Sequence, residues 1–197
     1  MQAALLTVIA GIADAVGFIT MGGVFAANMT GNTVLAGIAA AQGRTLDAAR
    51  HLSPLVAFFV GAMLARLLLR LWHKPAIPLL LEALIVAALA VLPVAMEPAV
   101  LILAFAMGLQ AAGMTHFGGT AVSTVVVTST LARTAEAALD SIWRSHQAPI
   151  HPVARPWLLV LSWAGYLAGA VIGAGLLQVM AVPLIVPALL LVIVVFL

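Results

Sequence analysis

The sequence predicts an all-α integral membrane protein, on the evidence of its composition and of the form and length of its apolar blocks. Of the 197 residues, 65% are hydrophobic and only 7% are charged. Soluble domains carry about 25% charged residues, so this chain lacks the side chains that a water-facing surface needs. The apolar blocks are continuous, unlike the alternating strands of a membrane barrel, and most are long enough to span a bilayer as helices.

The same composition restricts the chemistry of the chain. It has no cysteine, which excludes disulfides and cysteine metal sites, and eight basic residues against six acids indicate membrane topology rather than nucleic-acid binding. We find no HExxH, no GxSxG with a plausible histidine and no carboxylate pair. We therefore expect no enzyme activity, no cofactor and no metal. We expect one membrane domain over residues 1–197, without a cleavable signal peptide because no basic segment precedes the first apolar block.

The first half contains three apolar blocks and one broken segment. The blocks cover 3–20, 52–72 and 77–95. The segment 24–42 lies between the first two blocks, begins with an extended apolar run, breaks at 28–32 and continues as a helix. We expect three full membrane spans and one half-helix here.

The second half shows the same order of parts. Its apolar blocks cover 99–116, 157–180 and 182–197, and its broken segment covers 120–139. A polar loop follows that segment. The predicted fold is therefore six full transmembrane helices plus two broken segments.

This shared order indicates two internal repeats, approximately 1–97 and 98–197. Residue matches support the repeat, although Gly- and Ala-rich membrane helices can also match by chance. The matches are Gly11 with Gly108, Gly22-Gly23 with Gly118-Gly119, Thr30 with Thr128, and Phe59-x-Gly61 with Trp163-x-Gly165.

The path of the broken segments determines the topology. If each segment dips into the membrane and returns, each half has three spans and the second repeat is inverted. If each segment crosses, the repeats are parallel. The distribution of Lys and Arg gives four against two in either model and places the N-terminus in the cytoplasm, so the choice stays open. We expect the inverted arrangement, which is a recognised plan of transporters.

Two stretches carry a resemblance to a known family. Residues 11–37 read GIADAVGFITMGGVFAANMTGNTVLAG, and residues 107–133 read MGLQAAGMTHFGGTAVSTVVVTSTLAR. These stretches resemble the YoaK-like family of small bacterial multi-pass membrane proteins, whose function is unknown. The resemblance implies a location in the bacterial plasma (inner) membrane.

Polar residues in the first broken segment are candidates for solute binding. Asn28, Thr30, Gly31 and Asn32 interrupt an apolar stretch at membrane depth. The half-helix that follows would direct its N-terminal amides at the break, which suits an anion or a polar carbonyl. In the structural alternative, these side chains cap the half-helix and bond to a neighbouring helix.

The second broken segment and the fifth span supply further candidates. The hydroxyls could line a cavity shared by both repeats, or bond back to the preceding helical turn. Gln110 lies close to the position that matches Asp14. The candidate hydroxyl residues are Ser123, Thr124, Thr128, Ser129 and Thr130.

Asp14 and His116 are the candidates for proton or ion coupling. An acid inside a membrane helix is expensive and faces a cavity or a partner. In the structural alternative, Asp14 bonds to the Asn-rich break, and His116 is an interfacial residue. Glu82 and Arg66 lie at equal distances from the turn between the third and fourth spans, so we expect a salt bridge between them.

These observations predict a secondary transporter or channel for a small polar or anionic solute. The alternative is a non-transporting membrane assembly or partner protein. In that case the face formed by Gly165, Gly169 and Gly173 would be the partner surface. The expected partners are the lipid bilayer, the solute and a second copy in a homodimer.

Overall fold

The structure is a computed structural model that describes residues 2–113, 116–117, 120–121, 127–142 and 156–197. It is helical apart from a two-residue antiparallel pairing of His116–Phe117 (β1) with Thr120–Ala121 (β2). The all-α class is therefore confirmed. The helices are α1 (Gln2–Thr20), α2 (Met29–Ala41), α3 (Thr45–Trp72), α4 (Ala76–Val91), α5 (Met96–Gly113), α6 (Val127–Ile142), α7 (Pro156–Val179) and α8 (Ile185–Phe196).

Among the described residues, four helices are long and apolar enough to cross a membrane, namely α1, α3, α5 and α7. The predicted spans 77–95 and 182–197 are shorter as helices, since α4 has 16 residues and α8 has 12. At 1.5 Å per residue they are about 24 and 18 Å long, against about 30 Å of hydrocarbon. Two prolines account for the shortening. Leu92 is extended before Pro93, and α8 begins only after Pro183.

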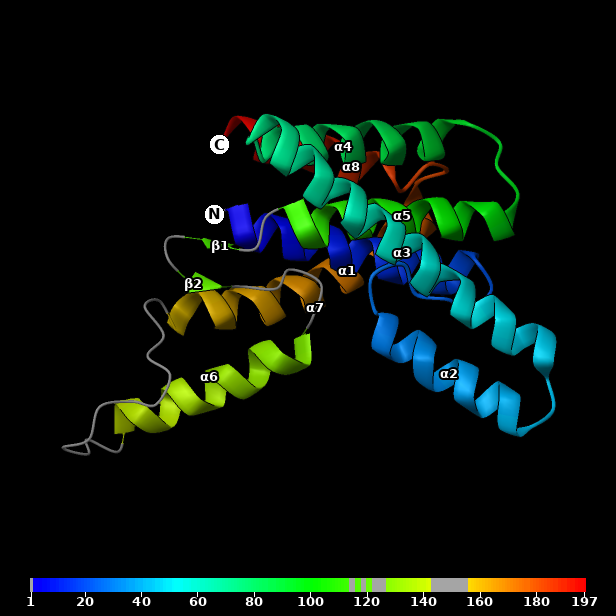
Figure 1. Cartoon of the computed structure of the whole chain (residues 1–197), viewed down its shortest axis with the longest axis horizontal. Helices are drawn as coiled ribbons and strands as arrows, with labels where there is room; N and C mark the ends of the chain where they lie inside the picture. Colours follow the sequence, from blue (N-terminus) through cyan, green and yellow to red (C-terminus); the bar gives the residue numbers. More distant parts are fainter. Residues whose placement is uncertain (1, 114–115, 118–119, 122–126, 143–155) are drawn as a thin grey trace.

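Two pairs of long helices form the centre of the molecule (Figure 1). One pair is α1 with α7, and the other is α3 with α5. Glycines allow the backbones to touch in both pairs. A Cβ added to Gly11 would lie 2.1 Å from the Tyr166 carbonyl oxygen, and one added to Gly108 would lie 2.1 Å from that of Phe58. No larger residue fits there without separating the helices.

Contacts along the helices fix their relative directions. In α7, Gly165, Gly169 and Gly173 face α1 in the same order as the α1 residues they approach, so these two helices run parallel. The Gln110 side chain near the end of α5 donates to the carbonyl of Leu6 near the start of α1, at 3.0 Å. Helix α5 is therefore antiparallel to α1.

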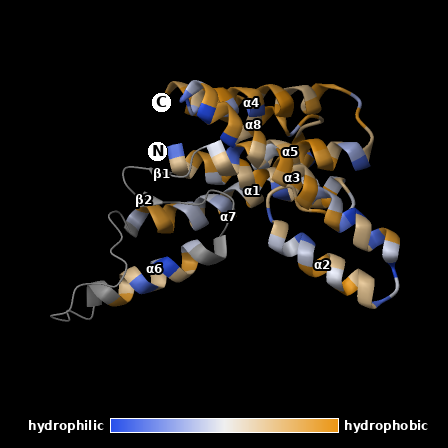
Figure 2. Cartoon of the chain, in the orientation of Figure 1, coloured by the Kyte–Doolittle hydropathy of each residue, from blue (hydrophilic) through white to orange (hydrophobic). Residues whose placement is uncertain are grey.

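The remaining helices lie on two sides of this centre (Figure 1). Helix α4 packs on α8 and α5. Helix α2 packs on α3, and α6 packs on α7, on the side away from α4 and α8. Helices α4 and α8 are almost entirely apolar, whereas α6 carries several polar residues (Figure 2).

The predicted salt bridge between Glu82 and Arg66 is wrong. Within the described part of the chain, the ion pairs are Arg44 with Asp47 and Arg50 with Glu97. Arg66 is exposed on α3, and Glu82 is fully buried. The helices of this hairpin separate because α3 lies along α5 while α4 turns its buried face to α8 and α5.

Candidate functional site

A linker of turns and bends over residues 21–28 joins α1 to α2, where the sequence predicted an extended run. Gly22 and Gly23 adopt positive φ angles of 77° and 74°, a conformation that glycine adopts without strain. The linker ends at Asn28, and α2 begins at Met29, within the predicted break at 28–32.

Asp14 is the group that holds this linker against the core. Its carboxylate is buried in α1 and accepts hydrogen bonds from the backbone N–H of Ala27 at 2.6 Å and of Asn28 at 3.3 Å. Its other oxygen accepts a hydrogen bond from the Tyr166 hydroxyl of α7. One carboxylate therefore joins two long helices and the linker. These bonds to the Asn-rich break are the ones expected if Asp14 has a structural role. A role of Asp14 in proton or ion coupling stays a prediction.

The two asparagines of the break stabilise the local backbone. The Asn28 side-chain oxygen accepts from the Gly31 N–H at 3.0 Å and caps α2. The fully buried Asn32 accepts from the Phe25 N–H at 2.9 Å and donates to the Phe25 carbonyl at 2.8 Å. Its amide thus satisfies both backbone groups of Phe25 and fixes the middle of the linker against α2.

Thr30 and Gly31 lie at the start of α2 in different surroundings. Thr30 is exposed, and its role in solute binding stays a prediction. A Cβ added to Gly31 would lie 2.9 Å from the Asn28 amide nitrogen and 3.0 Å from the Phe25 ring. The space beside Gly31 is therefore filled by the chain itself.

The second group of candidates is only partly described. Thr130 is buried in α6, and its carbonyl accepts a hydrogen bond from Thr134. Ser123 and Thr124 lie outside the described residues, as do the side chains of His116, Thr128 and Ser129. Gln110 is fully buried between α5 and α1. Helices α2 and α6 lie at opposite ends of one side of the molecule (Figure 1), and a cavity shared by the two segments stays a prediction.

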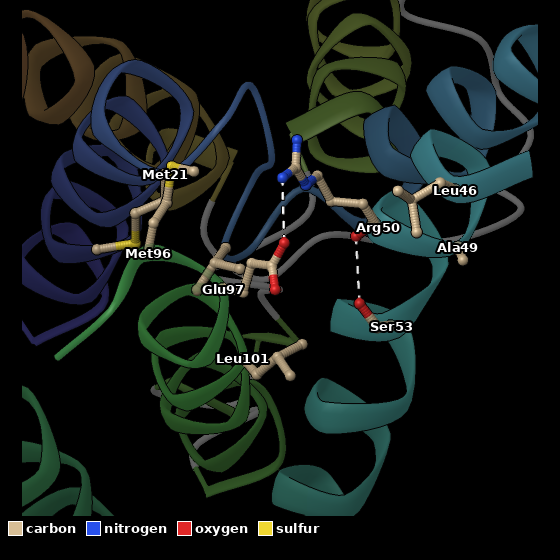
Figure 3. Close-up of a pocket in the computed structure, with 9 residues that line it drawn as sticks. Met21, Leu46, Ala49, Arg50, Ser53, Met96, Glu97 and Leu101 are labelled. Carbon is tan, nitrogen blue, oxygen red and sulfur yellow. Dashed lines mark hydrogen bonds and ion pairs between the residues drawn. The ribbon is translucent and has the colours of Figure 1, made fainter. Parts of the chain in front are cut away.

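A pocket of about 270 Å³ lies where α1 ends and α3 and α5 begin (Figure 3). Its polar groups are Arg50, Ser53 and Glu97, and the guanidinium of Arg50 lies 3.1 Å from the carboxylate of Glu97. Apolar side chains, including Met21 and Met96, form the rest of the lining. None of the residues selected from the sequence lines this pocket.

Two features of this region were not predicted from the sequence. The pocket is built from the ends of three helices, and no sequence spacing reveals that arrangement. Tyr166 could have been found, because it is the only tyrosine of the chain and lies within an apolar helix. A buried phenolic hydroxyl seeks a hydrogen-bond partner, and Asp14 was the available acid.

Comparison with known proteins identifies relatives. Residues 2–197 match the family described as "Protein of unknown function (DUF1275)". The chain is 33% identical over 139 residues to the "UPF0700 transmembrane protein YoaK" of Bacillus subtilis (strain 168), an alignment that covers 65% of this chain and 62% of that relative. No solved structure matches the chain. Together with the four apolar helices, these similarities show that the chain is a membrane protein.

Proposed function

The chain belongs to the DUF1275 family of proteins of unknown function, and from this premise we propose that it is a secondary transporter for a small polar or anionic solute. The proposed architecture is two inverted repeats, each with three crossing helices and one half-helix, in the bacterial inner membrane. The observation that carries the proposal is a pair of equivalent helix crossings.

The two crossings correspond residue by residue. A Cβ added to Gly11 of α1 would lie 2.1 Å from the carbonyl oxygen of Tyr166 and 2.8 Å from the amide nitrogen of Ala170, both in α7. Gly108 of α5 meets Phe58 and Ala62 of α3 in the same way, at 2.1 and 2.9 Å.

The reciprocal contacts have the same register. A Cβ added to Gly169 would lie 2.2 Å from the carbonyl oxygen of Val8, and one added to Gly61 would lie 2.1 Å from that of Phe105. The first-repeat and second-repeat positions differ by 97 in α1 and α5 (108 − 11, 105 − 8) and by 108 in α3 and α7 (166 − 58, 169 − 61). Chance similarity of Gly-rich helices does not explain a shared register in two reciprocal crossings. This register pairs Gly61 with Gly169 rather than with the Gly165 of the sequence comparison.

The helix directions support inversion. Helices α1 and α5 are the first helices of the two repeats and run antiparallel. The end of α1 and the start of α3 line the same pocket, so the linker and α2 return to the side on which α1 ends. A dipping half-helix leaves three crossings in each half, and an odd number inverts the second repeat.

Charge at the two ends supports a cytoplasmic N-terminus. Arg70 lies in the last turn of α3 and Lys74 follows it, and this end of α3 lies at the same end of the molecule as the N-terminus. At the opposite end, Arg44 and Arg50 are both paired with acids. In the inverted arrangement the side of Arg70 and Lys74 carries four Lys and Arg residues against two on the other side, and such an excess marks the cytoplasmic side.

In the proposed mechanism, solute reaches the two broken segments from alternate sides of the membrane. The pocket beside the Arg50–Glu97 pair is the entry on the outer side, where an entering anion would compete with Glu97 for the guanidinium. Asp14 couples the linker to the helix pair α1–α7, because one of its oxygens accepts from the linker amides and the other from Tyr166, and protonation of either oxygen would weaken one of these two connections. Inverted repeats alternate by rocking one helix unit against the other around such a site.

The alternative of a non-transporting partner protein loses its proposed surface. Gly165, Gly169 and Gly173 contact α1 of the same chain, so this face is covered. A homodimer remains part of the proposal, with the exposed lipid-facing helices as its contact.

Topology is the first test, because the chain has no native cysteine. Asp47→Cys and Lys74→Cys lie at opposite ends of α3, outside the candidate site. A membrane-impermeant thiol reagent applied to intact cells should label Cys at 47 and leave Cys at 74 unlabelled until the cells are opened. Labelling of both positions from outside would refute the proposed topology.

Transport is then measured on the purified full chain in liposomes. Solute-induced currents across a panel of small organic and inorganic anions should identify substrates, and Asp14→Asn should reduce them without loss of folded protein. Absence of current for every solute, with correctly inserted protein, would leave the partner-protein alternative as the better account.

A further inference from the structure

Glu82 is a buried acid without a hydrogen-bond partner in the described part of the chain, and the proposed mechanism does not use it. It lies in the middle of α4, and its side chain is completely inaccessible. Neither carboxylate oxygen has a hydrogen-bond partner among the described residues, which include all of α4 and the helices packed on it. Asp14, by contrast, has three donors.

The helices around Glu82 offer it no countercharge. Helix α8 contains no titratable residue, and the sole titratable residue of α5 is Glu97, at its far end and paired with Arg50. Helix α3 carries Arg66 and Arg70 toward this depth, and both are exposed. An ionised carboxylate without a partner is very unfavourable in such surroundings, whereas the neutral acid is tolerated.

The fold itself does not require an acid here. Helices α4 and α8 both have a buried proline as their third residue, Pro78 and Pro187. The residue four positions further on is Glu82 in α4 and Leu191 in α8, and both are fully buried. A leucine therefore fills the equivalent place in the other half of the molecule.

We propose that Glu82 is a proton-binding site within the membrane, distinct from Asp14 and His116. Glu82 holds a proton in the conformation described here and exchanges it with the aqueous phase when the helices rearrange. Its use as the coupling proton rests on the proposed transport function, whereas proton binding itself does not.

Proton binding is tested with dicyclohexylcarbodiimide, a lipid-soluble reagent that adds to protonated carboxyl groups in apolar surroundings. The full chain in liposomes is treated at mildly acidic and mildly alkaline pH, and the adducts are located by peptide mass spectrometry. We expect an adduct at Glu82 that falls severalfold at the higher pH, and none at the exposed Glu97. Glu82→Gln should abolish the adduct, because an amide does not react.

The stability of Glu82→Leu separates a chemical from a structural role. If Leu191 is its true counterpart, Glu82→Leu should fold with equal or higher thermal stability and lose the adduct. Lower stability of this variant would mean that Glu82 makes a structural bond, and would overturn the proposal.

Other results also decide the question. No adduct on correctly folded protein, or an adduct that does not change with pH, would show that Glu82 is not an exchanging proton site. A pH-dependent adduct in a protein that moves no solute would refute the transport function and leave the proton site standing.

Discussion

Replacing Asp14 by alanine should strongly destabilise the protein, and replacing it by asparagine should not. Asp14→Ala removes the acceptor of the Ala27 amide, the Asn28 amide and the Tyr166 hydroxyl. Ala27 is only 3% exposed, so its N–H would find no water.

The magnitude follows from the three donors. An unsatisfied buried donor costs about 1–3 kcal/mol. The Ala27 amide should lose the full amount, while the long bond of Asn28 and the partly buried Tyr166 should lose less. We expect a loss of about 2–5 kcal/mol in the free energy of unfolding for Asp14→Ala. Asp14→Asn keeps one oxygen for the linker amides, and the Tyr166 hydroxyl can turn to accept from the new amide, so about 1 kcal/mol is expected.

The assay is unfolding in mixed micelles by increasing sodium dodecyl sulfate, followed by tryptophan fluorescence. Tyr166→Phe removes one donor and should fall between wild type and Asp14→Ala. Equal destabilisation by Asp14→Asn and Asp14→Ala would refute the reasoning, because it would mean that the negative charge, not the acceptor geometry, holds the linker.

Three other changes test the packing and the surface. Gly11→Ala and Gly108→Ala each place a Cβ 2.1 Å from a carbonyl oxygen and should each destabilise the protein by about 1–3 kcal/mol. The control is Gly175→Ala in α7, where no atom lies within 4 Å of the added Cβ, and it should be neutral or slightly stabilising in a thermal-shift measurement. Asn32→Ala should lose about 2 kcal/mol and increase proteolysis within residues 21–28, because both hydrogen bonds to Phe25 disappear; protection of this linker equal to wild type would contradict the role assigned to Asn32. Glu97→Gln should change stability by less than about 1 kcal/mol, since its pair with Arg50 is solvent-exposed, and a larger loss in the same unfolding assay would mean that the pair is shielded.

Local features of the fold were predictable from the sequence. The helical class, the linker after Gly22 and Gly23, and the start of α2 beside Asn28 follow from composition, glycine and capping chemistry within a few residues. The early end of α4 was also available, because Pro93 disfavours helix at Leu92.

Features that depend on which helices become neighbours were not predictable. The predicted salt bridge between Glu82 and Arg66 assumed that α3 and α4 pack against each other along their length, but α3 packs along α5 instead. Tyr166, which donates a hydrogen bond to Asp14, is 152 residues away in the sequence. The role of the glycines that bring α1 and α7 together can be recognised only once it is known that these two helices pack against each other. Asn28 and Asn32 were selected correctly as unusual, but no spacing in the sequence distinguishes a residue that holds its own backbone from one that holds a solute.

The exchange of helices between the two halves has a consequence for biosynthesis. Helix α1 packs along α7, and α3 packs along α5, so each half leaves its glycine faces without a partner until the other half is made. During translation, α1 must wait in the bilayer for most of the chain to be inserted before Gly11 meets Tyr166. Neither half should therefore form a stable protein alone, whereas two fragments cut after residue 94 and expressed together should reassemble. A chaperone or insertase that shields the open faces of α1 and α3 during this interval would determine how much of the protein reaches its folded state.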